Sequence, residues 1–175
     1  DGVLDEKIAC GTRNFAKEPA MTEKETLDAI DTGVRLVKQC KENGYQILAT
    51  GEMGIGNTTT SSAVTAALLH RLASETAGRG AGLNDKGLSR KKQVIQEAID
   101  RYDLYKADAF TVLQTVGGFD IAGLTGVFIG GAMYHVPIVL DGLISGAAAL
   151  LAKRIIPGTE HFMIASHLGK EPAAK

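Results

Sequence analysis

The sequence predicts a doubly wound α/β fold, in which a mainly parallel sheet is flanked by helices on both faces. Apolar runs at residues 45–50, 136–140 and 161–165 show no polar alternation, which is typical of parallel strands buried on both faces. The order of strand, loop and helix recurs along the chain, with glycines gathered at the ends of the apolar runs. These observations indicate a Rossmann-like, three-layer arrangement. With 175 residues and no internal repeat or linker, the chain is expected to form a single domain over residues 1–175.

The N-terminal part of the chain predicts a long helix followed by the first strand. Thr22 and Glu25 form a capping-box pattern, and apolar residues follow them at helical spacing. The helix is expected to run from residue 21 or 22 to about residue 43, where Gly44 stops it. The strand at residues 45–50 then ends directly in the glycine-rich segment 51–56.

The remaining elements alternate between helices and the other two strands. A second glycine-rich loop lies at residues 78–82, and Ser89 is expected to cap the helix that follows it. The segment 122–133 is small and apolar, and its pattern fits either a helix or a strand. The other helices are predicted at residues 57–72, 89–102, 107–116 and 145–154.

The composition excludes several classes of protein. The 19 basic and 20 acidic residues leave a net charge of −1 without a basic stripe, so nucleic acid is not an expected partner. The most apolar stretch, residues 123–152, is broken by glycines, Pro137 and Asp141, so no membrane span is expected. Cys10 and Cys40 lack metal-ligand spacing and fit a reducing compartment better than a disulfide scaffold. We therefore expect a cytoplasmic protein.

The strongest functional pattern is the glycine-rich segment between the first strand and the next helix. A strand, a glycine turn and a helix N-terminus aim backbone N–H groups at one point, which favours an anion and most often a phosphate. Gly51, Gly56 and Thr58 match P-loop spacing, but Asn57 stands where a P-loop has lysine, which disfavours a nucleoside-triphosphate kinase. A monoester phosphate fits better, with Lys91 as the best candidate to neutralise it. A glycine turn that only caps the helix is the structural alternative.

Carboxylates and a serine–histidine pair follow the predicted strands. Glu52 would repel a phosphate held by the same amides, so we expect it to point away from the anion and toward a cationic part of the ligand. Asp141 and Gly142 end a strand where a ribose hydroxyl could bind, with helix capping as the alternative. Asp120, beside paired glycines, and Ser166–His167 are weaker candidates. Because the carboxyl ends of parallel strands meet at one edge, the loops after residues 50, 140 and 165 should converge on one site.

Taken together, these segments resemble the nicotinate-nucleotide–dimethylbenzimidazole phosphoribosyltransferase family over essentially the whole chain. The matching strings, in family order, are Gly11-Thr-Arg-Asn14, Pro19-Ala-Met-Thr22, Gly51-Glu-Met-Gly-Ile-Gly-Asn-Thr-Thr59, Gly78-Arg-Gly-Ala-Gly82, the helix with Lys91, Val116-Gly-Gly-Phe-Asp-Ile-Ala-Gly-Leu-Thr-Gly126, Val139-Leu-Asp-Gly142 and Ser166-His167. The resemblance implies a 5′-phosphate site and places a ribose and the reacting centre beside it. The implied ligand contacts are Gly54, Gly56, Asn57, Thr58, Gly80 and Lys91 to the phosphate, Asp141 and Gly142 to the ribose, Glu52 near the reacting centre, and Ser166 to the substrate.

The family transfers phosphoribose from nicotinate mononucleotide to 5,6-dimethylbenzimidazole, giving nicotinate and α-ribazole phosphate for the lower ligand of cobalamin. The resemblance therefore implies small-molecule substrates, no cofactor, no metal and a homodimer. It also implies that residues 1–175 are the central portion of a longer enzyme, because an N-terminal Ala-Asp-His-Gly-type motif and a C-terminal Gly-Glu-Gly motif of the family are missing here. The general-base glutamate belongs to the second motif, so we expect this chain alone to be nearly inactive.

Two further points follow from the comparison with the family pattern. Gly169 stands where many relatives carry serine, so one ligand contact is expected to differ. From a different class, a non-catalytic module that binds nucleotides or other phosphate anions is the alternative to an enzyme.

Overall fold

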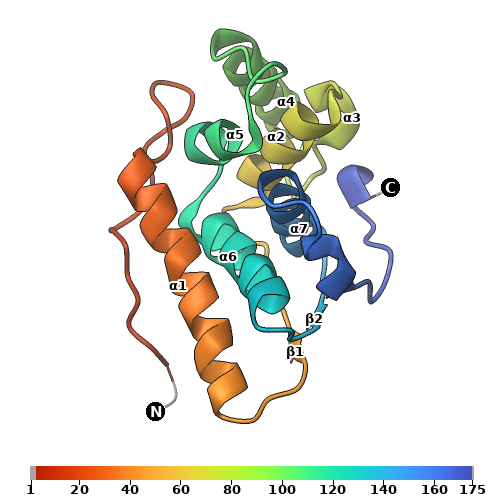
Figure 1. The fold of residues 1–175 in the computed structure, drawn as a ribbon. Coiled ribbons are helices and arrows are strands. Elements are labelled where there is room, and N and C mark those ends of the chain that lie inside the picture. The colour runs from red at the N-terminus through yellow and green to blue at the C-terminus, as the bar shows by residue number, and fades with distance from the viewer. Residues whose placement is uncertain (1–2, 175) are drawn as a thin grey trace.

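The computed structural model describes residues 3–174, which form seven α-helices and three short strands (Figure 1). The helices are α1 (Glu23–Glu42), α2 (Thr58–Leu69), α3 (Ala73–Thr76), α4 (Asp85–Arg101), α5 (Ala109–Val116), α6 (Phe119–Met133) and α7 (Leu143–Ile155). The strands are β1 (Leu48–Ala49), β2 (Ile138–Val139) and β3 (Met163–Ile164), and two 3-10 turns lie at Thr159–Phe162 and Pro172–Ala174. None of the helices within the described residues combines the length and apolarity needed to span a membrane.

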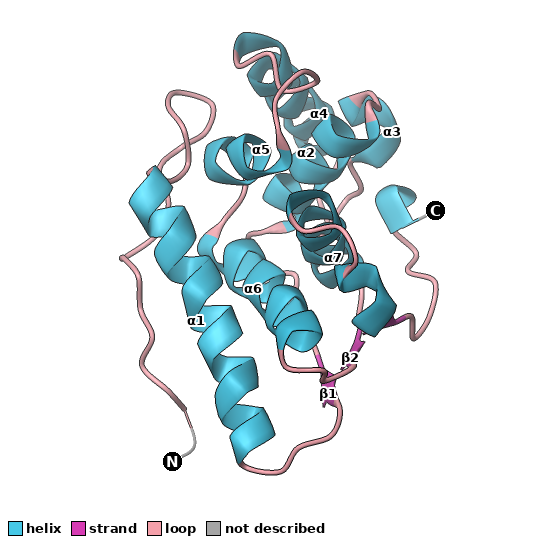
Figure 2. Ribbon diagram, in the orientation of Figure 1, coloured by secondary structure: helices cyan, strands magenta, loops and turns pink. Residues whose placement is uncertain are grey.

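The three strands form one parallel sheet in the order β1-β2-β3, which confirms the predicted α/β class. In register, Leu48, Ile138 and Met163 form one row across the sheet, and Ile138 in its centre is fully buried against the helices. The next row points to the other face, where Ala49 and Ile164 are exposed. The strands are shorter than the apolar runs predicted, and helices make up most of the ribbon (Figure 2). The α/β class is as predicted, but the expectation of helices on both faces is not met within the described residues, where the row with Ala49 and Ile164 is open to solvent.

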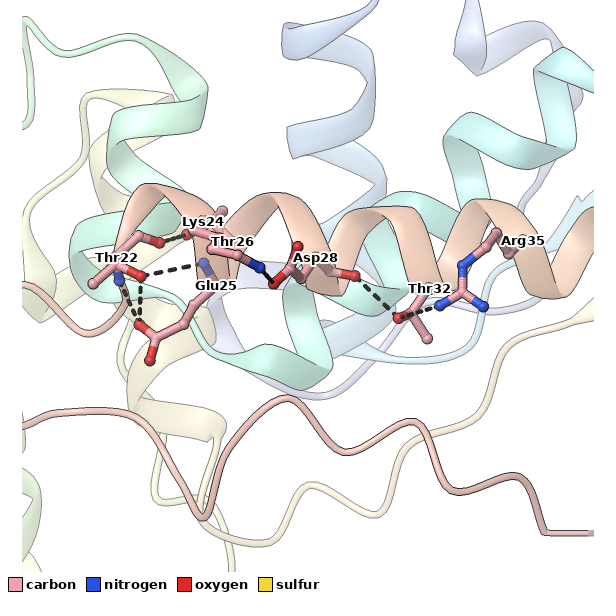
Figure 3. A network of polar contacts seen from close by, with 7 residues as sticks. All are labelled: Thr22, Lys24, Glu25, Thr26, Asp28, Thr32 and Arg35. Carbon is pink, nitrogen blue, oxygen red and sulfur yellow. Dashed lines mark hydrogen bonds and ion pairs between the residues drawn. The ribbon is translucent and has the colours of Figure 1, made fainter.

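The capping box predicted for α1 is present. The Thr22 hydroxyl accepts a hydrogen bond from the Glu25 N–H at 3.2 Å, and the Glu25 carboxylate accepts one from the Thr22 N–H at 2.6 Å (Figure 3). Arg13 adds an ion pair to the same carboxylate at 2.5 Å. These bonds satisfy N–H groups that would otherwise lack a partner at the start of the helix.

The ambiguous segment 122–133 is helical and belongs to α6, which lies beside α1 (Figure 1). Glycines allow the two backbones to touch. A Cβ atom at Gly126 would lie 1.9 Å from the carbonyl oxygen of Ile30, and one at Gly33 would lie 2.0 Å from the carbonyl oxygen of Gly123. The small residues that made this segment hard to assign are thus the surface on which α1 packs.

Some predicted boundaries were wrong. Ser89 does not cap α4: the helix begins four residues earlier, and the side chain of Asn84 accepts the N-cap hydrogen bond from Gly87 N–H at 2.8 Å. An asparagine at this position caps as well as serine does, so the helix starts at the first available cap. Helix α7 begins at Leu143 rather than at residue 145, with Gly142 as its N-cap.

Candidate functional site

The loops after the three strands converge on one cavity of about 410 Å³, as the sequence predicted, and we call it the strand-end cavity. Its walls come from the glycine loop after β1, the N-termini of α2 and α7, and the segment after β3. The lining residues are Glu52, Met53, Gly54, Thr58, Asp141, Gly142, Leu143, Ile144, Ser145, His167, Leu168, Gly169, Lys170 and Glu171. This is the edge of a parallel sheet where ligands bind in open α/β folds.

The N-terminus of α2 opens toward this cavity through Thr58. Its N-cap, Asn57, makes no side-chain cap bond, so the amides of the first turn are not satisfied by the usual capping oxygen. The preceding loop is shaped by Gly54 and Gly56, whose φ angles of 73° and 82° lie in the left-handed region that favours glycine. A twelve-residue helix with uncapped amides behind a glycine loop is suited to an anion.

Lys91 reaches the same place from α4. Only 6% of the residue is exposed, and its Nζ donates to Thr58 Oγ1 at 2.9 Å and to the Gly78 carbonyl at 3.0 Å. No carboxylate of the described residues lies within ion-pair distance of it. Burial without a counter-ion lowers the pKa of this lysine below its usual value. Gly80 completes the group, because a Cβ atom there would lie 2.5 Å from Thr58 Oγ1.

Glu52 does not have the predicted orientation. Its carboxylate turns back onto its own loop and accepts a hydrogen bond from the Gly54 N–H. The reason is electrostatic, because a carboxylate is attracted to the backbone N–H groups that the loop gathers. Glu52 also borders a second cavity of about 420 Å³, which we call the loop cavity. The loop cavity is lined by Gly11, Thr12, Glu52, Ile55, Gly56, Asn57, Thr60, Gly118, Phe119 and Asp120.

Asn57 faces the loop cavity rather than the strand-end cavity. Its Nδ2 donates to the carboxylate of Asp120 at 2.6 Å, and the asparagine is 8% exposed. Gly118 makes room for this contact, since a Cβ atom there would lie 2.5 Å from Asp120 Oδ1. The side chain of Asn57 therefore binds Asp120 of α6 and does not cap α2, and only the backbone of Asn57 lies at the start of α2.

Asp141 and Gly142 line the strand-end cavity, as predicted. Two residues that sequence reasoning missed hold this turn. Ser145 is fully buried, and its hydroxyl accepts a hydrogen bond from the Asp141 N–H at 3.2 Å and lies 2.5 Å from the hydroxyl of Thr50 at the end of β1. Thr50 and Ser145 each lie within five residues of a predicted strand end, which is a signal in the sequence. The sequence does not show that the two side chains meet, because they are 95 positions apart.

Ser166 lies outside the strand-end cavity. Its hydroxyl donates to the Leu140 carbonyl at 2.5 Å and contacts His167 Nδ1 at 2.8 Å, so it ties the end of β3 to the end of β2. It lines a smaller cavity of about 220 Å³ on the other side of the Asp141 turn, whereas His167 and Gly169 line both. Within the described residues, no group of three or more His, Cys, Asp or Glu side chains is placed to hold a metal ion.

The sequence and the fold of this chain are similar to those of known proteins. A family model described as phosphoribosyltransferase matches residues 1–175. The nicotinate-nucleotide–dimethylbenzimidazole phosphoribosyltransferase of Acetivibrio thermocellus is 47% identical over 175 residues, which are 100% of this chain and 50% of the relative. The enzyme of that name from Clostridium perfringens is 44% identical over 171 residues, which are 98% of this chain and 47% of the relative.

A solved structure leads to the same family. The crystal structure of CobT from Thermus thermophilus has a TM-score of 0.93 and 38% identity, and the match covers 99% of this chain and 52% of that one. The chain spans about half the length of the curated relatives it matches. Because the family model matches the whole chain and the curated relatives are 44% and 47% identical to it, this protein belongs to the nicotinate-nucleotide–dimethylbenzimidazole phosphoribosyltransferase family.

Proposed function

We propose that this chain supplies the nucleotide-binding part of an enzyme that transfers phosphoribose from nicotinate mononucleotide to 5,6-dimethylbenzimidazole, giving nicotinate and α-ribazole phosphate. The observation that carries the proposal is the buried Lys91 ammonium at the start of α2, which has two neutral acceptors and no carboxylate partner among the described residues. A buried cation without a counter-ion is costly, and a bound anion would remove that cost. The family membership adds support, since the relatives carry this activity in their names.

The 5′-phosphate is proposed to bind between α2, α4 and the two glycine loops. Lys91 would supply charge, Thr58 its hydroxyl and first-turn amide, and Gly54 an N–H after the Glu52 carboxylate leaves it. The backbone N–H groups of Gly56 and Asn57 would contribute further donors. The backbone of Gly80, which lies close to Thr58, would do the same. This arrangement recognises a single phosphate monoester through backbone amides and one ammonium, without the P-loop lysine that a triphosphate requires.

The ribose and the reacting carbon are proposed to lie deeper in the strand-end cavity. Asp141 would accept a hydrogen bond from a ribose hydroxyl beside Gly142, with Ser166 supporting the neighbouring loop. The Glu52 carboxylate would face the pyridinium ring and the positive charge that develops on the ribose. The C1′–nitrogen bond breaks and its electron pair returns to the pyridinium nitrogen. A lone pair on the incoming base then forms the new bond to C1′, and the base gives up its N–H proton to the general-base glutamate of the family's Gly-Glu-Gly motif.

Positioning is the main contribution of this chain to such a reaction. The leaving group is already cationic, so holding the phosphate and ribose in line with the acceptor removes much of the barrier. We further propose that residues 1–175 form one nucleotide-binding core, that the enzyme is a homodimer, and that it works in the cytoplasm. The family resemblance supports the first two, and the two free cysteines support the third.

Calorimetric titration with three ligands tests the proposal. Nicotinate mononucleotide should bind, nicotinate riboside should bind at least about 30-fold more weakly because it lacks the phosphate, and ATP should not compete. Equal affinities for the mononucleotide and the riboside would contradict a phosphate site. Magnesium-dependent binding of ATP would instead favour a kinase-like site.

A further inference from the structure

A directed chain of hydrogen bonds runs beneath the strand-end cavity. The Thr50 hydroxyl donates to the Val139 carbonyl at 3.0 Å and lies 2.5 Å from the Ser145 hydroxyl. The Ser145 hydroxyl also accepts from the Asp141 N–H at 3.2 Å. The chain thus connects the end of β1, the end of β2 and the first turn of α7.

Counting protons fixes its direction. Each hydroxyl carries one hydrogen, and that of Thr50 is already used on Val139. Ser145 must therefore donate its own hydrogen to Thr50 while it accepts from Asp141. The result is a one-way order from the Asp141 N–H through Ser145 and Thr50 to the Val139 carbonyl, in which every hydroxyl both donates and accepts.

Burial makes this chain stiff. Ser145 is fully buried, and the Val139 carbonyl also accepts the backbone N–H of Thr50 at 3.0 Å, so the Val139 end of the chain is anchored in the sheet. A buried network whose members are all satisfied holds one geometry, because losing any bond leaves a polar group without a partner. The Asp141 turn itself lacks such anchoring, since Gly142, the N-cap of α7, makes no side-chain cap bond.

We propose that Ser145 and Thr50 are positioning residues that set the Asp141 turn for the ribose of a bound nucleotide. Neither hydroxyl needs to touch the ligand: each acts through the backbone N–H of Asp141. This inference rests on the proposed function, in which Asp141 binds the ribose. It predicts an effect on ribose binding and none on phosphate binding, because the Lys91–Thr58 contact shares no hydrogen bond with this chain.

The test uses two disruptive variants and two controls in the 175-residue chain. Ser145→Ala and Thr50→Val each break the chain at nearly constant volume, whereas Thr50→Ser keeps the hydroxyl and should restore it. Thr125→Val is the matched control, because it removes a fully buried hydroxyl on α6 that donates to the Ile121 carbonyl at 2.8 Å, away from the cavity. Affinities for nicotinate mononucleotide and for inorganic phosphate are measured by calorimetry for each protein.

Breaking the chain should weaken mononucleotide binding by about fivefold to tenfold, which corresponds to one hydrogen bond. Phosphate binding should change by less than about twofold. Thr50→Ser and Thr125→Val should bind both ligands like the parent. Unchanged mononucleotide affinity in the folded Ser145→Ala protein, or an equal loss for inorganic phosphate, would overturn the inference.

Amide hydrogen exchange separates this inference from the proposed function. The Asp141 N–H should be protected in the parent and in Thr50→Ser, and should exchange at least about tenfold faster in Ser145→Ala and Thr50→Val. This measurement needs no ligand. If the parent fails to bind the mononucleotide, the proposed function is wrong and the ribose assignment falls with it. If the Asp141 amide exchanges equally fast in all five proteins, the hydrogen-bond chain does not hold the turn, whatever the ligand.

Discussion

Replacing Lys91 with methionine separates the contribution of this lysine to ligand binding from its contribution to folding. Methionine has a similar length and no charge, so the variant keeps most of the packing of α4 against α2 while it removes the ammonium. The two contributions are expected to differ in size and in their dependence on pH.

The expected effect on stability is small because opposing contributions nearly cancel. Removing the buried charge relieves a desolvation cost of several kcal/mol. It also leaves Thr58 Oγ1 and the Gly78 carbonyl without their donor, at about 1–3 kcal/mol each. We therefore expect the free energy of unfolding of the variant without ligand to lie within about 1 kcal/mol of the parent. The affinity for nicotinate mononucleotide should fall much more, by about 10-fold to 100-fold, because a hydrogen bond to a charged group contributes about 1.5–3 kcal/mol.

The stability of the parent relative to Lys91→Met should change with pH in one direction. Burial lowers the pKa of Lys91 in the folded chain below the 10.5 of an ordinary lysine. Below the lowered pKa both the folded and the unfolded chain are protonated, and the full cost of the buried charge is present. As the pH rises from the lowered pKa toward 10.5, the folded chain has lost the proton and the unfolded chain has not. The parent should therefore gain stability relative to Lys91→Met across that window.

Urea denaturation and calorimetric titration measure these two quantities, with Lys86→Met as the control. Lys86 is exposed on the same helix, so its replacement makes the same change in net charge and should leave the affinity nearly unchanged. A Lys91→Met protein that loses more than about 3 kcal/mol of stability yet binds the mononucleotide like the parent would refute the reasoning. Lys91 would then be a structural cross-link between α4 and α2.

Three other predictions concern the frame around the site. Gly126→Ala should destabilise the chain by about 3 kcal/mol or more, because its Cβ would lie 1.9 Å from a carbonyl oxygen of α1, whereas Gly146→Ala in an open position of α7 should be neutral or stabilising by urea denaturation. Asp120→Ala should lower the melting temperature by roughly 2–8 °C because the buried Asn57 amide loses its acceptor, and Asp120→Asn, which keeps an acceptor oxygen, should restore most of it. Hydrogen bonds at the N-terminus of α1 lower the pKa of Glu25, so Glu25→Gln should reduce the free energy of unfolding near neutral pH. The difference from the parent should vanish when the pH falls below the lowered pKa, and a difference that does not depend on pH would contradict this.

Local rules were sufficient for much of the fold. The capping box at Thr22 and the helical spacing after it located α1 to within two residues. The apolar runs located all three strands, and the class of the sheet followed from the absence of polar alternation. The strands are shorter than predicted because an apolar run reports burial, whereas a strand requires a hydrogen-bonded neighbour along its whole length. The sequence pattern also could not tell which residue caps α4. Asn84 and Ser89 are equally good N-cap residues, and only the position of the preceding loop decides between them.

For the candidate site too, one part was predictable from the sequence and another was not. Its position was predictable, because parallel strands bring their carboxyl ends to one edge and the glycine segment follows such an end directly. The grouping of Lys91 with Thr58 agrees with the family resemblance, but spacing in the sequence would not have joined residues 33 positions apart. The Glu52 carboxylate accepts the Gly54 N–H, whereas the direction predicted from the sequence, toward a cationic part of the ligand, applies to a loop whose amides hold a phosphate.

Periodicity, caps and glycine placement depend on neighbours a few residues away, and so the sequence alone determined the α/β class, the long first helix and the strand edge where a ligand would bind. The tertiary structure decided which side chains meet there. Asn57 faces Asp120 across 63 positions, and Thr50 reaches Ser145 across 95. Three glycines of α6 (Gly123, Gly126 and Gly130) pack on α1, whereas Gly131 packs on Ile138 of the sheet. Such contacts form only after the core has set the distance between elements, because a hydrogen bond tolerates an error of a few tenths of an ångström and a sequence pattern specifies none.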